Sequence, residues 1–165
     1  MTSREKQNQF YPIVVRQRRL HMGFRFQGFF SDGDEALMTA ALSRWPFCTA
    51  KTIAAPFCGF GLRAPDCERE ADSDDEYERL LELSFAMKRG LAEFSNDFPA
   101  ATFVLIDADC FGGTCLYTGF VAQAGTVSFG VTEMQPGAEQ LQRLLWPLGV
   151  QLQSGYFAPF TRGYW

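Results

Sequence analysis

Two aspartates stand one residue apart near the end of the stretch "FVLIDADCFGGTC", residues 103–115. The apolar residues before them predict a strand, and alternate side chains of a strand share a face, so Asp107 and Asp109 point the same way. Two carboxylates in this arrangement can share Mg²⁺ or Mn²⁺, which would suit a small metal-dependent enzyme. In the structural alternative, the aspartates mark where the strand reaches solvent, and one of them accepts hydrogen bonds from the Gly112–Gly113 turn.

The sequence lacks the other parts of a metal or nucleotide site. It has no third acid in a matching context, no phosphate-binding Gly-Lys loop and a single histidine, His21. Gly59 and Gly61 are not followed by the third glycine of a dinucleotide-binding motif. We therefore expect no bound metal, no cofactor and no catalytic set of residues. Metal-dependent catalysis at Asp107 and Asp109 is kept as an alternative function.

The five cysteines could be nucleophiles, metal ligands or plain core residues. A thiolate nucleophile at Cys110 or Cys115 needs a base, and nothing in the sequence brings His21 near either of them. No closely spaced pair of ligands predicts a zinc site. We expect reduced, mostly buried thiols in a cytoplasmic protein. The cysteines are Cys48, Cys58, Cys67, Cys110 and Cys115.

Hydropathy and charge limit the classes of partner. No uncharged apolar run is long enough to span a membrane, and residues 1–20 lack the apolar region of a signal peptide. Residues 1–25 are basic with interleaved aromatics, as in nucleic-acid binders, but an isoelectric point near 5.0 argues against that function. The expected partner is therefore another protein, and neither a membrane nor a nucleic acid.

Periodicity and turn signals predict the elements that position these residues. Three late strands separated by glycine turns predict an antiparallel meander, and Ser31 or Asp32 can cap the first helix. Expected strands occupy residues 11–30 (a hairpin broken near residues 21–23), 49–62, 101–110, 115–123 and 126–131, and expected helices occupy residues 31–45, 73–96 and 137–149.

The order of these elements predicts the α+β class, with about three helices packed on one face of a mostly antiparallel sheet. The length of 165 residues fits a single domain over residues 1–165. The chain contains 17 phenylalanines, and we expect most of them in the core. We expect the aromatic segment 151–165 to be tied down against that core.

A strongly acidic tract precedes and begins the longest predicted helix. By composition, residues 64–73 form an exposed acidic loop. Ser73 and Glu76 have the spacing of a capping box, and Asp74 and Asp75 complement the positive end of the helix dipole. A structural role in helix capping is enough to explain these acids. Acids that are exposed together can, however, also attract and bind a basic partner.

The C-terminal half carries a family resemblance. An apolar strand that ends in Asp107 and Asp109 is followed by Phe111, Gly112 and Gly113, then by the helix "GAEQLQRLLWPLGV" and the aromatic segment "GYFAPFTRGYW". This pattern resembles a group of small bacterial proteins, some of them encoded beside polymorphic or secreted toxins and regarded as immunity proteins. Where that group usually continues with Gly and Gln, this chain reads "TCLY". The resemblance implies a stoichiometric inhibitor that binds a toxin.

The sequence therefore predicts a protein-binding inhibitor of the immunity type, with no enzymatic activity. Two alternatives are kept: a small metal-dependent enzyme, and an accessory subunit of a bacterial or phage assembly. The residues expected to contact the partner are Asp72, Asp74, Asp75, Glu78, Asp107 and Asp109.

Overall fold

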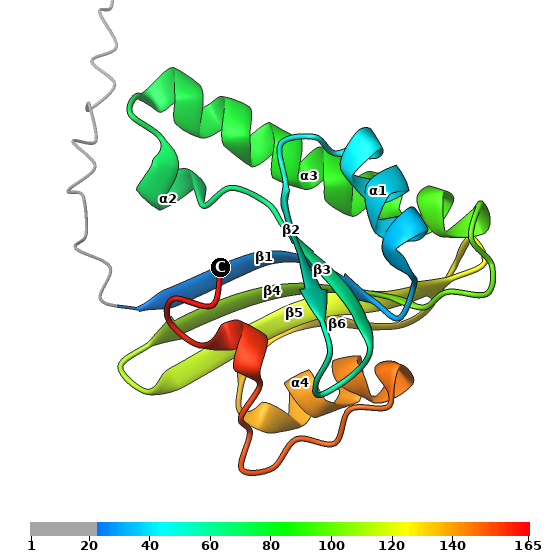
Figure 1. Cartoon of the computed structure of the whole chain (residues 1–165). Coiled ribbons are helices and arrows are strands. Elements are labelled where there is room, and N and C mark those ends of the chain that lie inside the picture. The colour runs from blue at the N-terminus through cyan, green and yellow to red at the C-terminus, as the bar shows by residue number, and fades with distance from the viewer. Residues whose placement is uncertain (1–22) are drawn as a thin grey trace, which may run out of the picture.

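The computed structural model describes residues 23–165. Within this range the chain forms a six-stranded antiparallel sheet of order β2-β3-β1-β4-β5-β6 (Figure 1). The first part of the hairpin expected over residues 11–30 lies outside the described residues. The strands are β1 (Phe24–Ser31), β2 (Thr49–Ile53), β3 (Gly59–Arg63), β4 (Phe103–Phe111), β5 (Thr114–Gln123) and β6 (Thr126–Pro136).

The α+β class and the antiparallel meander of β4, β5 and β6 are confirmed. Among the described residues there are four α-helices and two short 3₁₀ helices. None of these helices has both the length and the apolarity needed to cross a membrane. The helices are α1 (Glu35–Arg44), α2 (Cys67–Glu70), α3 (Asp74–Asn96) and α4 (Ala138–Leu145), with η1 (Trp146–Leu148) and η2 (Ala158–Phe160).

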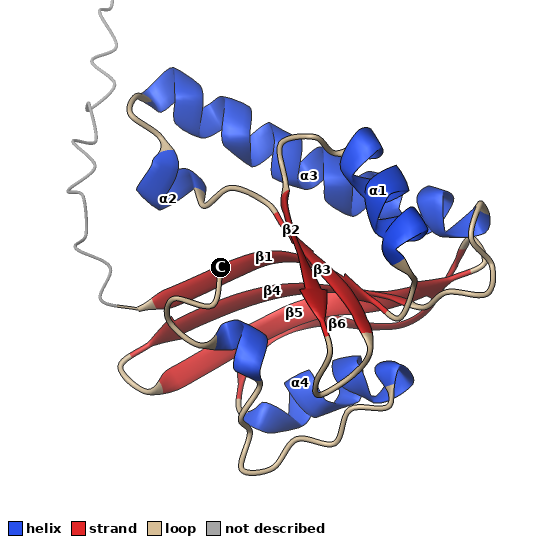
Figure 2. Cartoon of the chain, viewed as in Figure 1, coloured by secondary structure: helices blue, strands red, loops and turns tan. Residues whose placement is uncertain are grey.

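The helices lie on both faces of the sheet and not on one, which differs from the expected arrangement (Figure 2). The reason is visible in β4, where Phe103 and Leu105 point to one face and Val104 and Ile106 to the other, all of them buried. A strand that is apolar on both sides needs cover on both sides. Helices α1 and α3 cover the first face, and α4 with the C-terminal segment covers the second.

On the first face, Phe29, Phe103 and Leu105 pack against the buried side chains of α1 and α3, such as Leu37 and Leu91. The cap of α1 differs from the expectation. Asp34, and neither Ser31 nor Asp32, accepts the hydrogen bond from the N–H of Leu37, at 3.0 Å. The carboxylate of Asp32 instead accepts a 2.8 Å bond from the N–H of Thr102, so it ties the start of α1 to the start of β4.

On the second face, the core is built around phenylalanine. Phe26 and Phe30 are fully buried and stack with ring centroids 5.1 Å apart. Leu141, Leu144 and Leu145 of α4 pack against this cluster. The C-terminal segment contributes buried Phe157 and partly buried Phe160 and Trp165, so it is tied down against the core as expected.

The acidic tract is more structured than its composition suggested. Residues 64–73 are not an exposed loop throughout, because Cys67–Glu70 form α2 and Ala64, Asp66 and Cys67 are buried. Asp66 caps α2 by accepting a 3.1 Å bond from the N–H of Glu68. A short capped helix anchored by buried side chains therefore occupies the middle of the expected loop.

The predicted start of α3 is confirmed. The hydroxyl of Ser73 accepts a 3.2 Å hydrogen bond from the N–H of Glu76. The carboxylate of Glu76 accepts a 3.0 Å bond from the N–H of Asp72, one residue before the position that a standard capping box uses. These two bonds fix the direction in which the first turn of α3 presents its acids.

Candidate functional site

Asp107 lies between β4 and α3. Odd-numbered residues of β4 face α3, and there the ammonium group of Lys88 donates a 3.1 Å bond to the carboxylate of Asp107. The side chain of Asp107 is 20% exposed, so a partner can reach only a small part of it. Next to this pair, Ser84 and Gln27 form a 3.3 Å hydrogen bond between α3 and β1. Asp107 is thus part of a polar seam that joins the long helix to the sheet.

Asp109 shares the face of Asp107, as strand alternation predicted, but lies next to a different cation. Its register partner across β1 and β4 is Arg25, and the two residues line a small pocket together with Asp66 and Glu68. Arg25 forms a 2.7 Å ion pair with Glu68. Burial lowers the pKa of the Arg25 guanidinium, because it disfavours the charged form. The attraction of Glu68, together with Cys67 and Asp66, is larger, so the pKa is raised overall.

The two aspartates therefore have separate surroundings, with Lys88 beside Asp107 and Arg25 beside Asp109. Over residues 23–165, no group of three or more His, Cys, Asp or Glu side chains is arranged to hold a metal ion. A cation that competed for Asp107 would have to displace Lys88 from the seam.

The other four predicted contact residues gather on one exposed surface. Asp72, Asp74, Asp75 and Glu78 are all exposed at the start of α3, and we call this group the acidic surface. Glu76, between them, pairs with Arg79 at 3.6 Å. The six predicted residues thus fall into two groups, with four on the acidic surface and two between the sheet and the helices.

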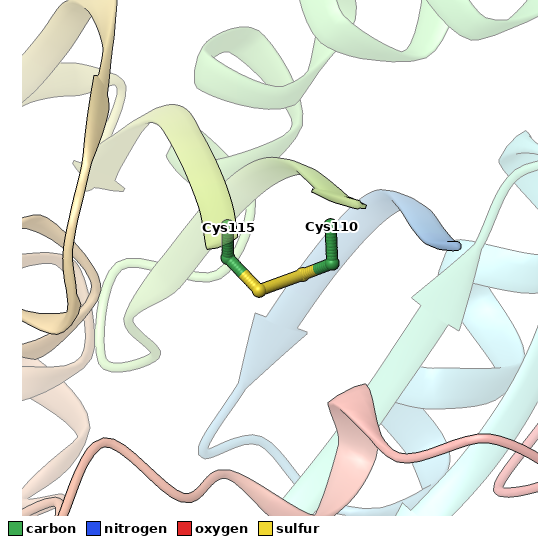
Figure 3. The surroundings of a disulfide bond; sticks show 2 residues. All are labelled: Cys110 and Cys115. Atoms are coloured by element: carbon green, nitrogen blue, oxygen red, sulfur yellow. A yellow bond between two sulfur atoms is a disulfide. The ribbon is translucent and has the colours of Figure 1, made fainter. Parts of the chain in front are cut away.

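The hairpin of β4 and β5 carries a disulfide that the sequence analysis did not expect. Cys110 and Cys115 are register partners with Cα atoms 4.0 Å apart, and their sulfurs are bonded (Figure 3). The prediction of reduced thiols is therefore wrong for this pair. The physical reason is the turn: Gly112 and Gly113 adopt φ of +59° and +82°, and this two-residue turn puts the cysteines directly opposite each other.

The other three cysteines are free thiols, and Cys58 is exposed. Burial raises the pKa of Cys48 to about 12, and its sulfur lies 3.6 Å from that of Met87. Burial also raises the pKa of Cys67, against the opposing effect of Arg25. Neither buried thiol is poised as a nucleophile at neutral pH. His21, the base considered from the sequence, lies outside the described residues.

Comparison of this chain with protein-family models, with curated proteins and with solved structures finds no match. Its functional assignment therefore depends on the geometry of its own side chains.

Sequence reasoning missed one group of charged residues. Arg25, Arg63, Arg69 and Arg162 line a common cleft with Trp165. They come from β1, β3, α2 and the C-terminal segment, and no motif or spacing in the sequence links them. The one available signal was the aromatic C-terminal segment. Its aromatic side chains were expected to pack against the core, and this packing places Arg162 at the cleft.

Proposed function

We propose that this protein is a stoichiometric inhibitor of the immunity type, which neutralises a bacterial toxin by docking the acidic surface onto a basic region of that toxin. The observation that carries the proposal is the set of four exposed carboxylates at the start of α3, Asp72, Asp74, Asp75 and Glu78. Within the described residues, no ion pair involves any of these four side chains.

The acidic surface is held in place before any partner arrives. The Ser73 cap fixes the first turn of α3, and Leu80 is buried one turn further on. Pre-organised contacts lose little conformational entropy on binding, which favours affinity. A cluster of exposed negative charges also raises the rate of association with a basic partner, and this effect weakens as the salt concentration increases.

An apolar side chain continues the same face of α3. Phe85 is 43% exposed and follows Glu78 by seven residues, which places both on one side of the helix. Protein interfaces commonly combine an aromatic anchor with a charged rim. Phe85 with Asp74 and Glu78 offers that combination on one rigid element, as an inhibitor surface requires.

The test is binding to the product of a neighbouring toxin gene, measured by calorimetry at low and high salt. We expect a tight one-to-one complex. The triple variant Asp74→Asn, Asp75→Asn, Glu78→Gln should bind at least about tenfold more weakly at low salt and should show a shallower salt dependence.

A matched control removes the same amount of charge elsewhere. Glu35→Gln, Glu93→Gln and Asp97→Asn neutralise three exposed acids outside the acidic surface and should leave affinity nearly unchanged. Equal affinities for wild type and the acidic-surface variant, or no complex with any neighbouring gene product, would contradict the proposal.

A further inference from the structure

Four arginines from separate segments converge on one cleft beside the start of β1. Their side chains line a space of about 420 Å³, open to solvent, that we call the arginine cleft. Figure 1 shows the end of the chain beside the start of β1, on the same side of the molecule as α2. The lining residues are Gly23, Phe24, Arg25, Arg63, Arg69, Thr161, Arg162, Gly163 and Trp165.

The wall formed by the C-terminal segment is firmly positioned. The indole N–H of Trp165 donates a 2.8 Å bond to the carbonyl of Pro159, and its ring centroid lies 5.4 Å from that of Phe26. A Cβ atom at residue 61 would lie 2.8 Å from the indole of Trp165, so Gly61 makes room for this ring. Lys51 binds the carbonyl of Tyr164 and lies 4.2 Å from the centre of its ring.

The arginines already use carboxylates as partners on the α2 side. Arg25 pairs with Glu68 at 2.7 Å, whereas Arg63 reaches Glu70 at only 3.7 Å. A guanidinium carries five N–H donors, and one carboxylate satisfies at most two of them with good geometry. Arg25 and Arg63 therefore have donor capacity beyond these pairs, and both are largely shielded from water, with 28% and 22% of their side chains exposed.

The start of β1 also lines the arginine cleft, and one of its edges lies beyond the end of the pairing with β3. Strand β3 pairs with β1 over Gly28–Ser31, and the N–H of Ala64 adds one further bond to the carbonyl of Gln27, at 2.7 Å. Backbone groups of alternate residues point to the same edge, so those of Arg25 point the same way as those of Gln27. At the next alternate position, the carbonyl of Gly23 accepts a hydrogen bond from Arg69.

Between these two bonds, no strand of residues 23–165 pairs with β1 on this edge. The edge therefore offers the N–H and the carbonyl of Arg25 to an incoming chain, at a residue that lines the cleft together with Arg63, Arg69 and Arg162. An incoming extended peptide could satisfy this backbone and pair its acidic side chains with the arginines.

We infer that the arginine cleft binds an extended acidic peptide segment of a partner protein, added as a short strand along the open edge of β1. Charge complementarity selects this occupant, because a basic or neutral strand would offer no carboxylate to the remaining N–H donors of Arg25 and Arg63. The inference does not depend on the toxin-inhibitor proposal, since the acidic surface on α3 calls for a ligand of the opposite charge.

The experiment measures fluorescence anisotropy of a labelled octapeptide of alternating Glu and Thr. The same peptide with Gln in place of Glu tests for charge. A Glu peptide N-methylated at every backbone nitrogen keeps its charge but cannot donate a hydrogen bond to a strand from either edge. We expect saturable binding of the Glu peptide, which salt weakens, and much weaker binding of the other two.

The double variant Arg63→Gln, Arg162→Gln should reduce affinity for the Glu peptide about tenfold or more. The double variant Arg79→Gln, Arg89→Gln is the matched control, because both arginines are exposed on α3 and pair with Glu76 and Glu82. The indole N–H resonance of Trp165 in the wild-type protein should shift on titration, which tests the site even if the double variant fails to fold.

Three results would overturn the inference. The first is equal binding of the Gln peptide or of the N-methylated peptide. The second is the absence of both anisotropy change and Trp165 shift in the wild-type protein at low salt. The third is displacement of the Glu peptide by inorganic phosphate or by a nucleic-acid oligomer at lower concentration than by unlabelled peptide, which would make the cleft a phosphate site.

Discussion

The two faces of the sheet are covered in different ways (Figure 2). One face is covered by α1 and by the 23-residue helix α3, whose buried stripe includes Leu80, Met87 and Leu91. The other is covered by the eight-residue helix α4 and by a C-terminal segment with little regular structure. We refer to them as the helix face and the tail face.

The stability of the two faces has different origins. On the helix face, local periodicity and a good cap already favour α3 before it packs. On the tail face, the aromatic contacts join segments far apart in the chain. Phe30, for example, has ring contacts with Phe57, Phe157 and Trp165 at centroid distances of 6.1, 5.2 and 6.4 Å. The tail face therefore depends on the whole fold being in place.

The strongest test of this comparison removes one buried side chain from each face. Leu91 and Phe157 are 0% and 3% exposed. We expect Leu91→Ala and Phe157→Ala each to lower the free energy of unfolding by about 3 kcal/mol, measured by urea denaturation, because both leave a cavity. A cost below about 1 kcal/mol for Phe157→Ala alone would show that the tail face lies outside the cooperative core.

The next test concerns the disulfide, whose sulfurs lie on the tail face of the hairpin. The double variant Cys110→Ser, Cys115→Ser should lose about 2 kcal/mol of unfolding free energy, because the bond closes only a short loop in the unfolded chain. Cys58→Ser, at an exposed free thiol, is the control and should be nearly neutral. If reductant leaves the wild-type unfolding curve unchanged, the bond does not form in solution.

The smallest effect is expected at the start of α3, on the helix face. Ser73→Ala removes the acceptor for the N–H of Glu76 and should cost about 1 kcal/mol. Ser73→Asn keeps a capping oxygen and should recover most of that loss. Equal stability of both variants and wild type in urea would mean that the cap does not hold the acidic surface in place.

Much of the fold near the predicted contact residues could be predicted from the sequence. Alternation along residues 103–110 correctly separated Asp107 and Asp109 from Cys110, and the glycine turns correctly placed the meander. The capping signal at Ser73 correctly placed the start of α3. These features depend on neighbours within a few residues, where periodicity and turn preferences act directly.

Other features could not be predicted because they depend on contacts between distant segments. The ion pair of Lys88 with Asp107 forms only because α3 packs across β4 at the position where these two residues meet. The placement of α4 on the second face follows from the two-sided burial of β4; the unbroken apolar run 103–106 indicates such burial but does not specify which helix covers which face. The disulfide was not predicted, because the cysteines were interpreted from composition and zinc-ligand spacing alone. Gly112 and Gly113 already indicated a tight turn, and such a turn places Cys110 opposite Cys115.

The sequence by itself determined the α+β class, the strand alternation at Asp107 and Asp109, and the four acids at the start of α3. Each of these is a local consequence of side-chain period, turn chemistry or capping. Only the tertiary structure decided which charges meet, since the pairing of Asp107 with Lys88 and the convergence of four arginines join segments that no short-range rule connects. Local rules specify elements, whereas charge pairing depends on how those elements pack.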